Sequence, residues 1–249
     1  MTTLSRLPNR KMGFYEKYIK RLLDILCALA AIIVFSWLFI IVAILVRAKL
    51  GSPVIFKQPR PGLVDPKTGQ ERIFNMYKFR SMTNEKDKDG KLLPDEKRLT
   101  RFGKLLRGSS MDELPEAFNI LKGDMSVIGP RPQLVRDMVF MTDQQRMRHT
   151  ARPGLSGLAQ ASGRNALTWE NKLNIDLEYI KTITFFEDVR IIIKTVGKVF
   201  LKKKEEEYQN VSEVDLAEDL GDYLLREGKV DKQTYTDKID LARTILRKR

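Results

Sequence analysis

The sequence predicts an α+β protein that is mainly helical, and three observations carry this prediction. A long uncharged apolar run near the N-terminus indicates a membrane helix. Two short runs rich in β-branched and aromatic residues follow it and indicate a small β-hairpin. Apolar residues at helical spacing occupy much of the remainder. We therefore expect an N-terminal membrane segment over residues 1–50, a compact domain with amphipathic interfacial helices over 51–204, and a C-terminal helical appendage over 205–249.

The apolar run extends from Ile25 to Val46, and none of its 22 residues is charged. As a helix it would be about 33 Å long, which is close to the hydrocarbon thickness of a bilayer. Basic residues flank the run on both sides, so the positive-inside rule selects no orientation. Two arrangements stay open: a single span, and a re-entrant helix that bends near Ser36 and returns to the same face. The second arrangement brings both basic flanks to anionic phospholipid headgroups.

Composition limits the chemistry. The chain of 249 residues has a formal net charge of +13, and this favours an anionic partner: nucleic acid, an acidic membrane or a phosphorylated substrate. The positive excess belongs to residues 1–204, because the segment from 205 onward has a net charge of −4. One cysteine (Cys27) and one histidine (His149) exclude an intramolecular disulfide and a multi-histidine metal site. Catalysis would therefore rest on carboxylates, Lys, Arg, hydroxyls and backbone amides.

The pattern along the rest of the chain predicts several elements. Strands are expected over 53–56 and 72–79, with turns over 60–63 and 66–69. A basic amphipathic helix is expected over 176–201, where it could lie in a membrane interface or face a soluble core. The acidic tail predicts two short helices around residues 226–229.

The stretch from Arg107 to Glu116 is the richest in reactive groups. Asp112 and Glu113 stand just before a predicted helix start, where acidic residues commonly cap the helix or complement its dipole. The cationic residues elsewhere in the sequence indicate more than helix capping. They lie in or beside loops marked by Gly and Pro: Lys78, Arg80, Arg107, Arg131 and Arg152. A carboxylate pair ringed by such cations suits a divalent cation and a diphosphate.

Four motifs stand in order along the chain: Asp112-Glu113-Leu114-Pro115, Lys122-Gly123-Asp124-Met125-Ser126, Gly129-Pro130-Arg131-Pro132 and Arg152-Pro153-Gly154-Leu155-Ser156-Gly157. Together they resemble the bacterial sugar transferase family, the small monotopic polyprenyl-phosphate phosphoglycosyl transferases. The resemblance covers about residues 14–201. The family's re-entrant helix is broken at a Ser-Pro pair, whereas Trp37 follows Ser36 here. A bend would then come from Ser36 bonding back to a carbonyl, helped by neighbouring structure.

The resemblance implies a two-step transfer of a sugar 1-phosphate from a UDP-sugar to undecaprenyl phosphate. Asp112 would attack the β-phosphate, release UMP and carry the phosphosugar, which the lipid phosphate then removes. Mg²⁺ held by Glu113 and Asp112 would neutralise phosphate charge. Lys78 and Arg107 would hold diphosphate oxygens, and Arg131 would contact the nucleotide. The full expected substrate-binding set is Lys78, Arg80, Arg107, Pro130, Arg131, Pro132, Arg152 and Arg164.

The resemblance also carries expectations about substrate and place. The stretch over residues 163–170 resembles members that act on N-acetylated, bacillosamine-type sugars. The catalytic domain is expected on the cytoplasmic face of a bacterial cytoplasmic membrane. The C-terminal extension could serve a homodimer or a downstream glycosyltransferase.

Two alternatives lack catalysis. One is a membrane-anchored scaffold, in which Asp112 and Glu113 only cap a helix. The other is a basic nucleic-acid-binding protein, although the sequence has no helix-turn-helix, zinc or base-stacking pattern. We expect no nucleic-acid partner.

Overall fold

The computed structural model describes residues 4–163, 168–205 and 218–248. The chain divides into two compact units that do not follow chain order. Unit 1 comprises residues 1–24, 59–74 and 123–249, and unit 2 comprises residues 25–58 and 75–122. Both strands of the hairpin, and the first long helix, continue from one unit into the other.

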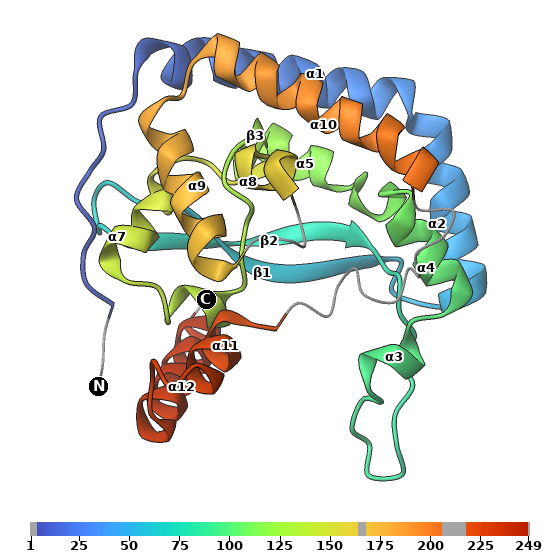
Figure 1. Ribbon diagram of the computed structural model, residues 1–249. Coiled ribbons are helices and arrows are strands. Elements are labelled where there is room, and N and C mark those ends of the chain that lie inside the picture. The colour runs from blue at the N-terminus through green and yellow to red at the C-terminus, as the bar shows by residue number, and fades with distance from the viewer. Residues whose placement is uncertain (1–3, 164–167, 206–217, 249) are drawn as a thin grey trace. The chain divides into compact units, whose positions relative to one another are not determined.

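The predicted membrane segment is a bent pair of helices. A short π-helical turn, Tyr15–Ile19, leads into α1 (Lys20–Val34), and α2 (Ser36–Leu50) follows after a break at Phe35. The two arms meet at a bend of 65°, which is visible in Figure 1. The N–H of Phe35 still donates to the Ala31 carbonyl, and Phe35 accepts from Phe39, so the break is local. Of the two arrangements left open by the sequence, the structure therefore has the one that bends next to Ser36, although no proline follows it.

Within the described ranges, no single helix is long and apolar enough to cross a bilayer, but this bent pair meets both criteria jointly. Large apolar side chains of both arms are exposed, including Ile33, Trp37, Ile40 and Ile44 at 59–71 %. The opposite face of α2 is buried. There Val42 and Val46 pack in a cluster with Phe79 and Leu106, which anchors α2 to the rest of unit 2.

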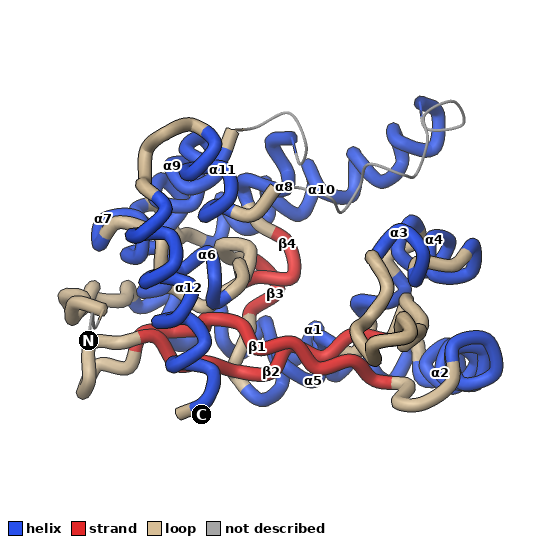
Figure 2. The backbone as a smooth tube through the Cα atoms, turned by 90° about the horizontal axis from the view of Figure 1, so that it is seen from below, coloured by secondary structure: helices blue, strands red, loops and turns tan. Residues whose placement is uncertain are grey.

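The hairpin consists of β1 (Ile55–Val64) and β2 (Glu71–Phe79), which run side by side in Figure 2. The predicted turn over 60–63 is wrong, because β1 continues through Pro61 and the chain reverses at Asp65–Gln70 instead. In a two-stranded ribbon each strand has an outer edge that needs no ladder hydrogen bond, so proline is tolerated there. The predicted turn over 66–69 lies within the actual reversal.

Short helices complete unit 2: α3 (Asp95–Arg98), α4 (Arg101–Gly108), a 3₁₀ turn (Met111–Glu113) and α5 (Glu116–Lys122). The N-terminus of α4 is capped by Thr100, whose hydroxyl accepts the Gly103 N–H. Such a cap satisfies one of the donors that a helix start leaves without a partner. The segment over 83–98 is rich in charged residues, ends in α3 and is largely exposed.

Unit 1 contains a parallel pair of short strands surrounded by helices. Strand β3 (Ser126–Ile128) pairs with β4 (Gly154–Ser156). The other elements are α6 (Val135–Met138), α7 (Asp143–Arg146), a 3₁₀ turn (Met147–Thr150), α8 (Leu158–Gly163), α9 (Trp169–Lys181), α10 (Phe185–Glu205), α11 (Leu220–Arg226) and α12 (Lys232–Arg247). The single helix predicted over 176–201 is wrong, since it breaks between α9 and α10. The two predicted tail helices are confirmed as α11 and α12.

The beginning of α1 is tied to unit 1 by buried charges. Lys20 donates to Asp188 at 2.6 Å, and Tyr15 and Tyr179 donate to the same carboxylate. One turn further along, Asp24 accepts from the Ser126 hydroxyl and the Val127 N–H. Each charge therefore has a partner that offsets its removal from water. These contacts hold the polar stripe of the first helical turns beside β3 and α10.

Replacing Leu106 tests the apolar cluster of unit 2. Leu106 is 3 % exposed, whereas the adjacent Leu105 is 71 % exposed. We expect Leu106→Ala to lower the free energy of unfolding by about 2–5 kcal/mol, because it leaves a cavity. The measurement is denaturant unfolding in detergent micelles. Leu105→Ala is the control, with a change of about 0.5 kcal/mol or less. Equal effects of the two variants would contradict the packing described here.

Candidate active site

Asp112 lies in the 3₁₀ turn between α4 and α5. Ser110, two residues before it, has a φ of +56°, a left-handed conformation that only a minority of non-glycine residues adopt. The turn that follows places Asp112 in the interior of unit 2, where the residue is only 7 % exposed. Glu113 is half-buried beside it. The two adjacent carboxylates therefore differ in their access to water.

Lys78 on β2 reaches the acidic residues of this turn and of α5. Its Nζ lies 2.8 Å from Glu113 Oε1 and 3.3 Å from Glu116 Oε1. Asn119 fixes the geometry: its Oδ1 accepts the Tyr77 N–H at 2.9 Å, and its Nδ2 donates to the Asn75 carbonyl at 2.7 Å. Because Asn119 is fully buried, these two bonds hold α5 against β2 and keep Lys78 in reach of the acids.

Arg107 stands at the end of α4 and donates from Nε to the Ser81 hydroxyl at 2.8 Å. Helix α4 approaches Ser81 so closely that a Cβ on Gly103 would lie 1.9 Å from the Ser81 carbonyl oxygen. Only glycine fits at this contact. Gly103 thereby brings α4, and Arg107 with it, against the segment that directly follows the strand of Lys78.

Arg80 makes contacts of a different kind. It is 6 % exposed and donates to the carbonyl of Met82 at 3.0 Å and to the carbonyls of Ser52 and Pro53. These bonds join the end of β2 to the segment after α2. The predicted contact of Arg80 with substrate stays a prediction.

Burial dominates the electrostatics of Asp112. It raises the pKa of this carboxyl to about 6, and the nearby charge of Glu113 acts in the same direction. The positive charges of Lys78 and Arg107 act in the opposite direction and keep the rise moderate. At neutral pH the group is therefore an anion that water solvates poorly and two cations stabilise.

Unit 1 holds the Pro130–Pro132 turn through its backbone. The Gly154 N–H donates to the Pro130 carbonyl at 3.0 Å, and Arg148 donates to the Arg131 carbonyl at 2.5 Å. Arg60 donates to the Pro132 carbonyl at 3.0 Å. All three carbonyls of this turn thus accept a hydrogen bond. Three different residues thus hold the backbone of the turn. The side chain of Arg131 is partly exposed.

Arg152, Pro130 and Pro132 also belong to unit 1. Arg152 donates from Nε to the Gly123 carbonyl at 3.1 Å, and burial lowers its pKa. Both prolines are buried. Arg164 lies outside the described residues. Unit 2 thus brings Lys78, Arg107, Asp112 and Glu113 together, while unit 1 holds the Pro130–Pro132 turn and Arg152.

Comparison with known proteins places these motifs in one family. The family model for bacterial sugar transferases matches residues 15–202, which is most of the chain and includes every residue of both sites. The chain belongs to the bacterial sugar transferase family. The family prediction from the four motifs is thereby confirmed, and so is the prediction of a transferase.

Individual relatives of this sugar transferase agree. An uncharacterized sugar transferase of Bacillus subtilis is 45% identical over 185 residues, 74% of this chain and 89% of that protein. A UDP-N-acetylgalactosamine-undecaprenyl-phosphate N-acetylgalactosaminephosphotransferase of Aeromonas hydrophila is 40% identical over 73% of this chain. An undecaprenyl-phosphate galactose phosphotransferase of Salmonella typhimurium is 34% identical over 80% of it. The chain spans 44% of the length of each of the latter two.

Sequence reasoning missed two residues beside the nucleophile candidate of the transferase. Glu116 follows Glu113 by three residues, a spacing that places side chains on one helical face, so this contact could have been anticipated. Asn119 had no sequence signal. Its partners, Asn75 and Tyr77, are more than forty residues away along the chain.

A buried charge network behind Arg131 was also missed. Arg148 forms a two-pronged contact with Asp176 of α9, at 2.9 and 2.5 Å, and both side chains are almost fully buried. His149 lies beside it, with Nε2 facing an N–H of Arg148 at 3.2 Å and Nδ1 at 3.1 Å from Glu71 Oε1. Since Arg148 only donates, Nε2 accepts and Nδ1–H donates. Burial lowers the pKa of His149, which is therefore neutral and structural.

The oxygen donors of Asp112 and Glu113 suit Mg²⁺, which prefers one or two carboxylates completed by water and substrate phosphates. Among the described residues, no cluster of three or more His, Cys, Asp or Glu side chains is arranged to hold a metal. Lys78 forms an ion pair with Glu113 in this structure, so a bound diphosphate would compete with Glu113 for the Lys78 ammonium group.

Removing Arg148 tests the buried network. We expect Arg148→Met to lower the free energy of unfolding by about 3–5 kcal/mol, because Asp176 is left buried without its partner. Chemical denaturation in detergent measures this change.

A double variant distinguishes the effect of leaving Asp176 without its ion-pair partner from the effect of losing the side-chain volume of Arg148. Arg148→Met/Asp176→Leu replaces both charges by apolar groups and should recover roughly half of the loss or more. Arg190→Met removes an exposed ion pair with Glu187 and should change stability by about 0.5 kcal/mol or less. A double variant as unstable as Arg148→Met would contradict the assignment.

Proposed function

We propose that this sugar transferase moves a sugar 1-phosphate from a UDP-sugar to undecaprenyl phosphate and releases UMP. The observation that carries the proposal is the buried Asp112 carboxylate, flanked by Glu113 and by the cations Lys78 and Arg107. Relatives whose names specify the reaction transfer a sugar phosphate to undecaprenyl phosphate. Those names give different sugars, so the donor is left as a UDP-sugar without further specification.

Asp112 acts as the nucleophile in the first step. One carboxylate oxygen attacks the β-phosphorus of the UDP-sugar, and the bond from this phosphorus to the bridging oxygen breaks. UMP leaves with the electron pair, and an aspartyl phosphosugar remains. In the second step an oxygen of the lipid phosphate attacks the same phosphorus and restores the Asp112 carboxylate. A carboxylate nucleophile in this way divides one difficult displacement into two easier ones.

The neighbouring residues make the attack of an anion on an anion feasible. Lys78 and Arg107 hold diphosphate oxygens and offset the negative charge that accumulates as UMP departs. Glu113, with Asp112, would hold Mg²⁺, which when bound supplies further charge neutralisation at the phosphates. The poor solvation of Asp112 leaves its anion less stabilised by water and therefore more reactive.

The bent helix pair is proposed to anchor this reaction at the cytoplasmic face of the cytoplasmic membrane. The 65° bend and the exposed apolar side chains of both arms support a re-entrant helix that returns to the face it entered. Basic residues on both flanks, including Lys17 and Arg47, would then meet anionic headgroups. The lipid phosphate would be presented at the same surface.

Replacing the nucleophile tests the proposal. Protein in detergent or nanodiscs is given Mg²⁺, undecaprenyl phosphate and a panel of UDP-sugars, and UMP release is measured. We expect release with at least one sugar, and a loss of about 10⁴-fold or more in Asp112→Asn, because the amide cannot attack phosphorus. Asp89→Asn, in the exposed loop over 83–98, is the control and should keep full activity. Wild type that releases no UMP from any sugar would favour the scaffold.

The pH dependence of the rate reports the ionisation of Asp112. Its anion is the reactive form and its pKa is raised to about 6, so kcat/KM should rise with pH through about 6 and level off above. Lys78→Met removes a charge that lowers this pKa, so the rising limb should move to higher pH. UMP release measured from about pH 5 to about pH 8 provides both profiles. A limb that moves to lower pH in the variant would refute this role of Lys78.

A further inference from the structure

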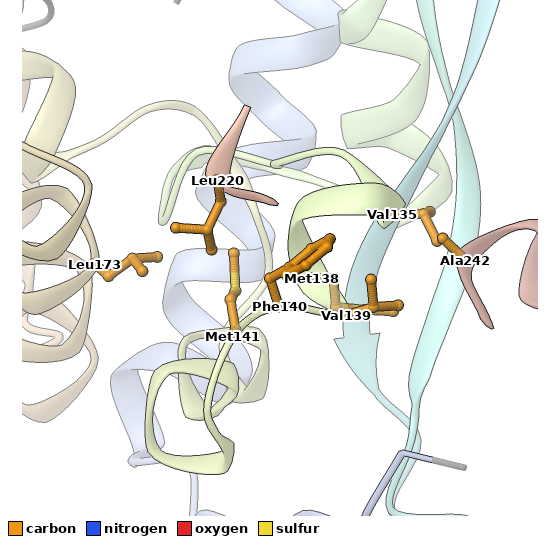
Figure 3. Close-up of a cluster of buried hydrophobic side chains, with 8 residues drawn as sticks. All are labelled: Val135, Met138, Val139, Phe140, Met141, Leu173, Leu220 and Ala242. Atoms are coloured by element: carbon orange, nitrogen blue, oxygen red, sulfur yellow. The ribbon is translucent and has the colours of Figure 1, made fainter. Parts of the chain in front are cut away.

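The C-terminal appendage, residues 218–248 with α11 and α12, lies outside the family match, which ends at residue 202. It packs into the main apolar cluster of unit 1. Leu220 and Ala242 are each 3 % exposed there (Figure 3). The helix α11 comes so close that a Cβ on Gly221 would lie 2.6 Å from the ring of Phe140. The appendage is therefore docked by specific packing.

Polar contacts attach the appendage to both ends of α6. At the start of α6, the buried Asp137 accepts the Leu134 N–H at 3.1 Å and the Leu220 N–H at 3.0 Å. At its end, Lys238 of α12 donates to the Val139 carbonyl at 2.8 Å. One carboxylate thus joins the first residue of α11 to the segment that leaves Pro132.

Arg136 of α6 adds an ion-paired contact to the same surface. Its guanidinium lies 2.5 Å from Asp219 and 3.2 Å from Asp222, and Tyr235 of α12 donates to Asp222 at 2.6 Å. Both acids belong to the appendage. The pairing therefore links α6 with α11 and, through Tyr235, with α12.

The appendage also contacts the beginning of α9. Trp169 donates from its indole N–H to the Glu218 carbonyl at 2.9 Å, and Glu170 accepts from Tyr223 and Lys229 at 2.9 and 2.5 Å. Helix α9 carries Asp176, which holds Arg148 on the Arg131 carbonyl. The appendage thus joins the two elements on which the Pro130–Pro132 turn depends: α6, which follows it directly, and α9.

We infer that the C-terminal appendage is a positioning element for the Pro130–Pro132 turn, whose Arg131 the family resemblance implies to contact the nucleotide, and that it strengthens binding of the UDP part of the donor. This inference rests on the proposed function. When the appendage is docked, α6 and α9 hold the turn in one conformation before the donor arrives. When the appendage is released, binding of the donor must also order the turn. The apparent affinity for the donor then equals the intrinsic affinity multiplied by the fraction of molecules in the competent conformation.

Two full-length variants release the appendage by different means. Gly221→Val introduces a clash with Phe140, and Asp219→Asn/Asp222→Asn removes the acids that pair with Arg136 without changing side-chain volume. The matched control is Asp237→Asn/Asp240→Asn, because among the described residues the contacts of these two acids lie within α12. Hydrogen exchange of the α6 amides measures the release directly.

We expect both release variants to raise the KM for the UDP-sugar by about tenfold and to keep kcat within about twofold. The Kd for UDP, measured by titration calorimetry, should rise by the same factor, and the control should match wild type. An appendage with a purely structural role would instead lower kcat through loss of active protein and leave KM unchanged. That result would overturn the inference, as would an unchanged KM despite faster exchange in α6.

The two proposals fail in different ways. If wild type releases no UMP, the proposed function fails, and the Kd for UDP in the same variants still decides the role of the appendage. Equal Kd values in wild type and in the release variants would overturn it. A rise in Kd without any UMP release in wild type would support a nucleotide-binding turn braced by the appendage in a protein of different activity.

Discussion

The removal of Asp112 from water is the constraint on which unit 2 depends. A buried carboxylate is unstable as an anion unless cations lie close to it. Lys78 and Arg107 provide this positive charge. Contacts made by other residues set the positions of both side chains. Asn119 holds the strand of Lys78 against α5, and the close approach at Gly103 holds the helix of Arg107. Contacts of the backbone and of the buried Asn119 therefore assemble the site, and they place Lys78 and Arg107 close to the acids of the turn.

Unit 1 also contains buried charged side chains, those of Arg148 and Asp176. The Arg148–Asp176 pair is almost fully removed from solvent, and such pairs seldom add to stability relative to well-packed apolar residues. Its geometry suggests why it is nonetheless present. A guanidinium that is held by a carboxylate on one side directs its remaining N–H groups to fixed points, here the Arg131 carbonyl. Through Arg148, the pair connects Asp176 of α9 to the Pro130–Pro132 turn.

The appendage lies beyond residue 202, where the match to the family model ends, and it adds further contacts to unit 1. It adds apolar packing, a buried carboxylate contact and ion pairs to α6 and α9, all on the side of unit 1 that supports the Pro130–Pro132 turn. In the proposed positioning role, the appendage sets how firmly this turn is held, through contacts with α6 and α9.

The sequence by itself determined the features that depend on local order. The apolar run predicts the apolar helices near the N-terminus, the ordered motifs identify the family, and the tail composition predicts two helices. Where a local signal was ambiguous, prediction failed: Pro61 and Gly62 suggested a turn, yet the strand continues because its outer edge needs no donor. The prediction of one helix over 176–201 failed for a similar reason. Apolar residues keep their helical spacing across the break between α9 and α10.

Only the tertiary structure decided which charged residues face a site and which support the fold. Arg80 and Arg107 look alike in the sequence, but Arg80 donates to backbone carbonyls while Arg107 lies near Asp112. Asn119, Arg148 and Asp176 had no signal at all. Their roles arise from contacts between residues far apart in the chain, and the burial that gives those contacts their strength exists only after folding.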